Sequence, residues 1–295
     1  MQASLFTTVF LPLALAVIML GLGLSLTKDD FKRVLVYPRA VFVGLLAQMV
    51  LLPAVAYGLA KALELPPELA VGLMLLAASP GGATANLFSH LAHGDVALNI
   101  TLTATNSLFS LFTLPLYIQW SLHAFLGEEK AIPLQSSKVV SVVLIILIPV
   151  LIGMAIRKKN AALATRLDKP VRIISALFLF SIIGATIVNE GDNLWTMFRV
   201  AGVAALVFNL ASMTVGYVLP RVFQVPDRQA VAIGMEIGIH NGTLAITIAS
   251  TLLGNPKMAI APAIYSLIMF VTATLFGLWA AKRIAKSPDA PETVA

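Results

Sequence analysis

Runs of about 20 apolar residues, separated by short polar connectors, fill almost the whole chain. A helix of that length crosses the hydrocarbon core of a bilayer. The pattern predicts nine transmembrane helices, at about 5–26, 40–60, 68–91, 96–124, 139–156, 171–188, 194–218, 228–253 and 259–281. No connector is long enough for a separate soluble domain, and residues 287–295 are expected to be a disordered tail. We therefore expect an all-α polytopic membrane protein with one transmembrane domain over residues 1–295.

The composition indicates the same class of protein. Of the 295 residues, 59% are hydrophobic and 12% are charged, whereas soluble domains contain about 25% charged residues. The chain has no Cys, which excludes disulfides and thiolate chemistry. Its net charge of +6 is best explained by basic cytoplasmic loops, so a nucleic acid partner is not expected. The lipid bilayer is the expected environment, and no obligate protein partner is indicated.

The basic residues also predict an orientation. With the N-terminus outside, fifteen Lys and Arg side chains fall on one side of the membrane and five on the other. Cytoplasmic loops carry such an excess of positive charge, so the C-terminus is expected in the cytoplasm. The apolar N-terminus lacks a preceding basic region and is too long for a signal-peptide core, which indicates a first span. We expect a multi-pass protein of the cell's inner membrane.

A repeat is visible within the chain. Residues 65–86 align without gaps to residues 225–246, at an offset of 160 residues. The third and eighth predicted spans run in opposite directions, so the repeats, at about 1–126 and 137–285, are expected to be inverted. Paired spans interrupted by Gly and Pro in two inverted halves indicate the binding site of a secondary transporter.

The interruption in the eighth span contains the only buried acidic residue that the pattern predicts. Glu236 and His240 lie within a glycine-containing apolar run. A carboxylate at this depth is costly unless it is paired or faces a wet cavity, and glycines there expose backbone carbonyls. We interpret the segment as a cation site at an unwound helix. A protonated glutamate that only joins helices is the alternative.

In the third span, Pro80 and the glycines after it break the helix at residues 79–82. The helix that restarts there presents free N–H groups, which suit an anionic group. An ordinary proline kink is the alternative. In the fourth span, Asn99, Thr103 and Asn106 fall on one helical face. Their oxygens suit Na⁺, as does that of Gln48, although such residues also simply hydrogen-bond helices together.

Three segments carry a resemblance to a known family. Residues 79–86, 92–98 and 236–242 resemble the bile acid:sodium symporter family, and the similarity extends from residues 19–24 to the last span. The resemblance implies a panel, here 1–62 and 138–190, that rocks against a core, here 65–126 and 194–283, in which the third and eighth spans cross as discontinuous helices. It further implies a symporter that takes up an organic anion with Na⁺ and needs no cofactor.

Carried over residue by residue, the resemblance implies two Na⁺ sites. One would use Asn86, Asn99, Thr103 and Glu236. The other would use Gln48, Glu236, the carbonyls of Ile237 and Ile239, and the side chain of His240. This chain departs from the family at Ala85, where Ser is common, and at His240, where Gln is common. Imidazole is a poor Na⁺ ligand and titrates near neutral pH, so the sequence leaves open two Na⁺ sites, one site, or proton coupling.

The substrate expectation comes from the last span and the first break. Met269 and Phe270 stand where bile-acid-binding members resemble one another through a His-Asn pair. We therefore expect a smaller carboxylate, pantoate-like or keto-acid-like, rather than a steroid. Its expected ligands are the helix-end amides of Gly82, Ala83 and Thr84 and the side chain of Asn241.

Two other classes of function were compared. Glu236 and His240 are four residues apart, but without an H-E-x-x-H motif or a third ligand they do not indicate an enzyme. A proton-coupled carrier or sodium/proton antiporter with crossed helices is the nearer alternative, because His240 could titrate. Such antiporters resemble one another in a mid-membrane Asp pair, and every Asp here lies in a loop or the tail.

Overall fold

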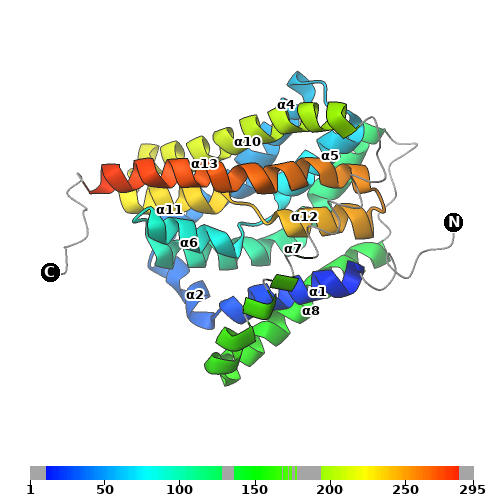
Figure 1. Cartoon of the computed structure of the whole chain (residues 1–295). Coiled ribbons are helices and arrows are strands. Elements are labelled where there is room, and N and C mark those ends of the chain that lie inside the picture. The colour runs from blue at the N-terminus through cyan, green and yellow to red at the C-terminus, as the bar shows by residue number, and fades with distance from the viewer. Residues whose placement is uncertain are drawn as a thin grey trace.

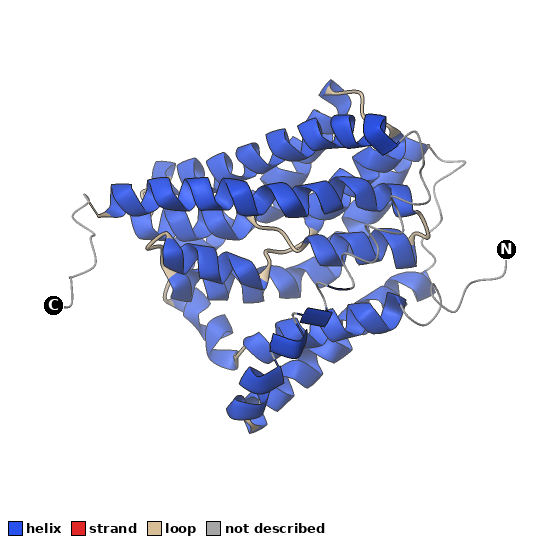
Figure 2. Ribbon diagram, in the orientation of Figure 1, coloured by secondary structure: helices blue, strands red, loops and turns tan. Residues whose placement is uncertain are grey.

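The computed structural model describes residues 11–127, 136–167, 169–171, 173, 174, 177 and 194–285, and within them the elements are helices (Figures 1 and 2). In chain order they are α1 Leu11–Ser25, α2 Lys28–Lys32, α3 Pro38–Leu46, α4 Leu52–Ala62, α5 Pro67–Ala78, α6 Ala83–Leu91, α7 Val96–Leu126, α8 Ser136–Lys159, α10 Leu194–Val222, α11 Asp227–Gly238, α12 Gly242–Thr247 and α13 Ile260–Ile284. Short π-helical turns, Ala47–Leu51 and Ile248–Leu252, follow α3 and α12.

The predicted helices agree with these bounds to within a few residues wherever the chain is described. Among the described residues, four continuous helical stretches are long and apolar enough to cross a membrane: Pro38–Ala62, Val96–Leu126, Trp195–Val222 and Pro256–Ile284. Large apolar side chains such as Phe112, Leu116 and Leu275 are more than 60% exposed on the bundle surface, as a lipid-facing surface requires. The predicted span at 171–188 and the tail at 287–295 lie almost entirely outside the described residues.

The repeat seen in the sequence is present in the local structure. Helices α5 and α11 have 12 residues each, and both of their ends differ by the offset of 160. The positive φ before each helix also recurs, 48° at Glu64 and 56° at Gln224. The residue after each of these closes the preceding helix. The amide of Leu65 donates to the Ala60 carbonyl, and 160 residues later the amide of Val225 donates to the Pro220 carbonyl. Two segments with little sequence identity therefore follow one backbone plan.

Helices α1 and α8 form a closely packed pair that lies beside the rest of the bundle (Figure 1). Gly23 allows this packing, since a Cβ there would stand 2.2 Å from the carbonyl oxygen of Val150. Helices α3 and α4 pack instead against α5, α7 and α10, and α4 lies at the opposite edge of the bundle. The packing thus groups residues 38–62 with the elements of the expected core, whereas the resemblance suggested a panel of 1–62.

Candidate functional site

The two helix breaks lie directly against each other near the centre of the bundle. The amide of Gly82 donates to the Ile239 carbonyl at 2.8 Å, and the amide of Asn241 donates to the Pro80 carbonyl at 2.8 Å. The chain turns extended between α5 and α6 because proline cannot continue the helix, and Ser79 has ψ of 141°. Each break therefore satisfies backbone groups that the other has freed.

Glu236 is fully buried at the end of α11, beside the first break. Its carboxylate accepts a hydrogen bond from the Thr103 hydroxyl at 2.6 Å and a longer one from Nδ2 of Asn106 at 3.4 Å. A Cβ on Gly81 would stand 2.2 Å from its Oε1, so only glycine leaves room for the carboxylate there. Among the described residues, no Lys, Arg or His forms an ion pair with Glu236.

Three amide oxygens in α6 and α7 are buried and have no hydrogen-bond partner. They belong to Asn86, Asn99 and Asn106. Asn99 is held by its other end, since its Nδ2 donates to the Ala232 carbonyl on α11 at 2.7 Å. A buried carbonyl oxygen without a donor costs free energy, which a bound cation would recover. Thus α7 carries Asn99, Thr103 and Asn106 along its face toward α11, as their spacing predicted.

This donor set suits a monovalent cation. Na⁺ is a hard ion that prefers oxygen ligands, and one carboxylate among neutral oxygens balances its single charge. Calcium sites usually bring together several carboxylates, and no group of three or more acidic, His or Cys side chains occurs in the part of the chain that the structure describes. Thr103 and Asn106 contact Glu236 directly, whereas Asn86 and Asn99 each contribute a buried free oxygen without a hydrogen bond to it.

His240 belongs to a separate, hydrogen-bonded cluster. Its Nδ1 lies 2.9 Å from the Tyr265 hydroxyl, which donates to the Gly238 carbonyl at 2.9 Å. Its Nε2 lies 3.4 Å from Nε2 of Gln48. The same Gln48 nitrogen donates to the carbonyls of Ala77 and Ser79, each at 3.0 Å, where α5 ends. The cluster therefore joins the second break to the first through side chains.

Some of the groups expected to bind the anion already make hydrogen bonds within the protein. Gly82 is the N-cap of α6 and its own amide is engaged by Ile239, so the unpaired N–H groups at this helix end are those of Ala83 and Thr84. At the other break, the Asn241 side chain caps α12 by accepting from the Leu244 amide at 3.0 Å. The first helix end is thus left open to an anion, and the second is closed by its own side chain.

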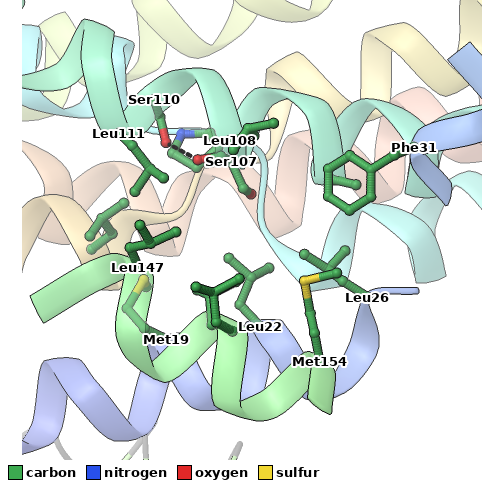
Figure 3. Close-up of a pocket in the computed structure, with 15 residues that line it drawn as sticks. Met19, Leu22, Leu26, Phe31, Ser107, Leu108, Ser110, Leu111, Leu147 and Met154 are labelled. Atoms are coloured by element: carbon green, nitrogen blue, oxygen red, sulfur yellow. Dashed lines mark hydrogen bonds between the residues drawn. The ribbon is translucent and has the colours of Figure 1, made fainter. Parts of the chain in front are cut away.

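An apolar cavity of about 250 Å³ lies between the α1–α8 pair and α7 (Figure 3). Met19, Leu22 and Met154 line it from the pair, opposite Ser107 and Leu111 of α7. Pro80 and Leu244 also line it, so the cavity reaches the first break and the helix that follows the second break.

Sequence reasoning located the breaks and the carboxylate but missed part of their surroundings. Asn106 was placed on the correct face but not in the Na⁺ set. The Gly238 carbonyl accepts hydrogen bonds from the Tyr265 hydroxyl and from Nδ2 of Asn209, each at 2.9 Å. These two residues come from α13 and α10, so the sequence around the break gave no signal of them. Only the position of these polar side chains within apolar spans could have indicated them.

Comparisons with known proteins indicate the family to which the chain belongs. The profile of the Sodium Bile acid symporter family matches residues 12–197. The chain is 27% identical to the uncharacterized sodium-dependent transporter YocS of Bacillus subtilis, over 96% of this chain and 87% of that protein. It is 27% identical to the probable chloroplastic sodium/metabolite cotransporter BASS1 of Arabidopsis thaliana (90% of this chain, 65% of that protein). It is 29% identical to the hepatic sodium/bile acid cotransporter of Rattus norvegicus (82% and 67%). The chain belongs to the Sodium Bile acid symporter family and is therefore a sodium-coupled membrane transporter rather than an enzyme.

Proposed function

We propose that this protein takes up a small organic anion together with Na⁺ across the cell's inner membrane by alternating access. The observation that carries the proposal is the environment of Glu236. A fully buried carboxylate without a basic partner, next to amide oxygens that lack donors, is costly unless a cation binds there. The Na⁺ ligands would be Glu236, Asn99, Thr103 and Asn86, with Asn106 added to the set.

The proposed architecture has nine spans in two inverted repeats, with the N-terminus outside and the C-terminus in the cytoplasm. It is supported by the match of α5 and α11 at an offset of 160 residues and by the contact between the two breaks, where the broken helices would cross. We assign α1 and residues 138–190 to the moving panel. The core would comprise 65–126 and 194–283, and α3 and α4 join it because they pack there.

Coupling would follow from the position of the ion. Na⁺ between Glu236 on α11 and Thr103 on α7 would draw α7 toward the helix that leads into the second break, and this break contacts the first through Gly82. The anion would bind at the end of α6. Ligands that favour the same arrangement of these helices increase each other's affinity, and each can shift the access states only by its difference in affinity between them.

The cavity supports an anion with an apolar body. Its lining is almost wholly aliphatic, with Ser107 and Ser110 as its polar side chains. A carboxylate could reach the open amides of Ala83 and Thr84, with Asn241 nearby, while the hydrocarbon part fills the space beside Met19. Among the relatives, one is named a sodium/bile acid cotransporter, and a bile acid is an organic anion with an apolar body; another is named a probable sodium/metabolite cotransporter.

The experiment is a thermal-shift titration of the purified protein with NaCl against KCl and choline chloride, with and without a panel of small carboxylates and bile acids. Ligands of the folded state raise the melting temperature by mass action. We expect a Na⁺-specific rise that increases with one carboxylate, and its loss in Glu236→Gln. Glu68→Gln, which removes a carboxylate at the start of α5, is the matched control and keeps the rise. A shift that responds to pH but not to Na⁺ would instead favour the proton-coupled alternative.

A further inference from the structure

A second apolar cavity opens on the surface of the bundle between α10 and α13, which lie side by side (Figure 1). It has a volume of about 340 Å³. Leu210 and Val218 of α10 and Leu275 and Trp279 of α13 line it, and all four side chains are exposed. From residue 210 to residue 218 the helix rises about 12 Å, so the cavity is an elongated groove. We call it the α10–α13 groove.

The groove offers little to a polar ligand along its length. Its two threonine side chains already donate to carbonyls of their own helices, Thr214 to Leu210 at 2.7 Å and Thr272 to Ile268 at 3.1 Å. The other lining side chains are aliphatic, aromatic or Met. Such a groove on the surface of a membrane protein suits an acyl chain, because lipid tails are as apolar as the side chains that line it.

One end of the groove is basic. Arg221 and Arg283 lie in the last turns of α10 and α13, each one turn beyond an aromatic residue of the lining. The guanidinium carbon of Arg221 lies 5.2 Å from the centre of the Tyr217 ring, and that of Arg283 lies 5.8 Å from the Trp279 ring. Both Nε atoms approach the carboxylate of Asp227, at 2.9 and 3.6 Å. One carboxylate between two guanidinium groups leaves a net charge of about +1 at this end.

The basic end also has hydrogen-bond donors to spare. A guanidinium group has five N–H donors, and within the described residues Asp227 is the only acceptor that the structure gives to Arg221 and Arg283. Their side chains are 39% and 42% exposed, so the remaining donors can reach a ligand. The hydroxyl of Tyr217 is buried without a hydrogen-bond partner. A phosphodiester has one negative charge and several acceptor oxygens, which match both the charge and the donors.

We infer that the α10–α13 groove binds an anionic phospholipid, with an acyl chain along the groove and the phosphate on Arg221 and Arg283. The inference needs neither the Na⁺ site nor the transported anion. In the proposed orientation the basic end faces the cytoplasmic leaflet, where anionic lipids attract basic side chains at helix ends. Because α10 and α13 both pack on α11, the bound lipid would stabilise the helices around Glu236.

The test measures how lipids with brominated acyl chains quench the fluorescence of Trp279, which lines the groove. The other two tryptophans, Trp120 and Trp195, are replaced by Phe in the full-length chain. The protein is reconstituted in phosphatidylcholine vesicles that contain brominated phosphatidylglycerol or, in parallel, brominated phosphatidylcholine. We expect the anionic lipid to bind beside Trp279 about fivefold more tightly than the zwitterionic one, since a basic residue near the headgroups attracts anionic lipid by about that factor.

Two double variants locate the origin of the preference. Arg221→Gln/Arg283→Gln should reduce the ratio of the two lipid affinities to about one. Lys158→Gln/Lys159→Gln, which removes two exposed charges at the end of α8, is the matched control and keeps the ratio. Equilibrium binding of ²²Na⁺ to the purified arginine variant should match that of the wild type, which checks that the variant is folded.

Three results would overturn the lipid site. They are equal quenching by the two lipids when both arginines are present, an unchanged preference in the arginine variant, and loss of the preference when millimolar glycerol phosphate is added. The last result would assign the arginines to a soluble phosphate instead of a lipid. The comparison of the two lipids requires no arginine substitution, so it decides the question even where the arginine variant does not fold.

Discussion

The break between α5 and α6 and the break between α11 and α12 follow the same backbone plan but carry different chemistry. The first contains no ionisable residue, and glycine at its N-cap leaves the amides of Ala83 and Thr84 open. The second contains His240 and follows Glu236, which lies in the last turn of α11, and its restarting helix is capped by the Asn241 side chain. An anion is therefore favoured at one break and a cation at the other. In the proposed function, the two similar elements are complementary half-sites that depend on their mutual contact.

That dependence is most directly tested at Gly81, where the first break makes room for the carboxylate of the second. In Gly81→Ala the new Cβ would lie 2.2 Å from Oε1 of Glu236, so the carboxylate must move from its Na⁺ position. We expect ²²Na⁺ affinity to fall by about 100-fold, which corresponds to roughly 2.7 kcal/mol. Gly58→Ala on α4 is the control, because its Cβ meets nothing within 4 Å. Equal affinities in the two variants would show that the breaks act independently.

The second test concerns the contact between α7 and the second break. Thr103→Val keeps the shape of the side chain but removes the hydroxyl that donates to Glu236 at 2.6 Å. Hydrogen bonds to charged groups are worth about 1.5–3 kcal/mol, so Na⁺ affinity should fall by about tenfold or more. Thr105→Val removes a hydroxyl that bonds only to the Thr101 carbonyl of its own helix, and Na⁺ titration should not distinguish it from the wild type. A comparable loss in both variants would point to the helix rather than to the ion site.

The position of the first break could be predicted from the sequence better than the side-chain contacts around the second break. Pro80 and the glycines beside it placed the first break at residues 79–82, and α5 ends at Ala78 as that predicts, because proline and glycine act locally. The roles of Gln48 and Tyr265 were not predictable in the same way. Each depends on which helix packs beside which, and a polar residue in an apolar span indicates a partner without identifying it.

The third test copies the cap of the second break into the first. In Gly82→Asn the new side chain could accept from the open amides at the start of α6, as Asn241 does at α12. It would compete with the carboxylate of the substrate, so we expect substrate-induced thermal stabilisation to weaken by about threefold in affinity, because caps of this kind differ by a few tenths to 1 kcal/mol. Binding of ²²Na⁺ without substrate should persist. Gly82→Ala separates the cap from the added bulk, since its Cβ lies 3.5 Å from the nearest atom. If both substitutions weaken substrate equally, space rather than capping distinguishes the breaks.

The smallest effect is expected where the two repeats differ at their outer ends. Asp227 opens α11 and pairs with Arg221 at 2.9 Å and, more distantly, with Arg283 at 3.6 Å, whereas Pro67 stands at the equivalent position of α5. The Arg221 side chain is 39% exposed, so solvent screens the pair and its contribution is at most about 1 kcal/mol. Arg221→Gln should lower the melting temperature slightly at low ionic strength. In 1 M salt, where the screening length is about 3 Å, the difference should disappear. A difference in melting temperature that persists in high salt would show that the effect comes from packing of Arg221 over the Tyr217 ring instead. In either case the ²²Na⁺ affinity should be unchanged, because the ion site is at the breaks.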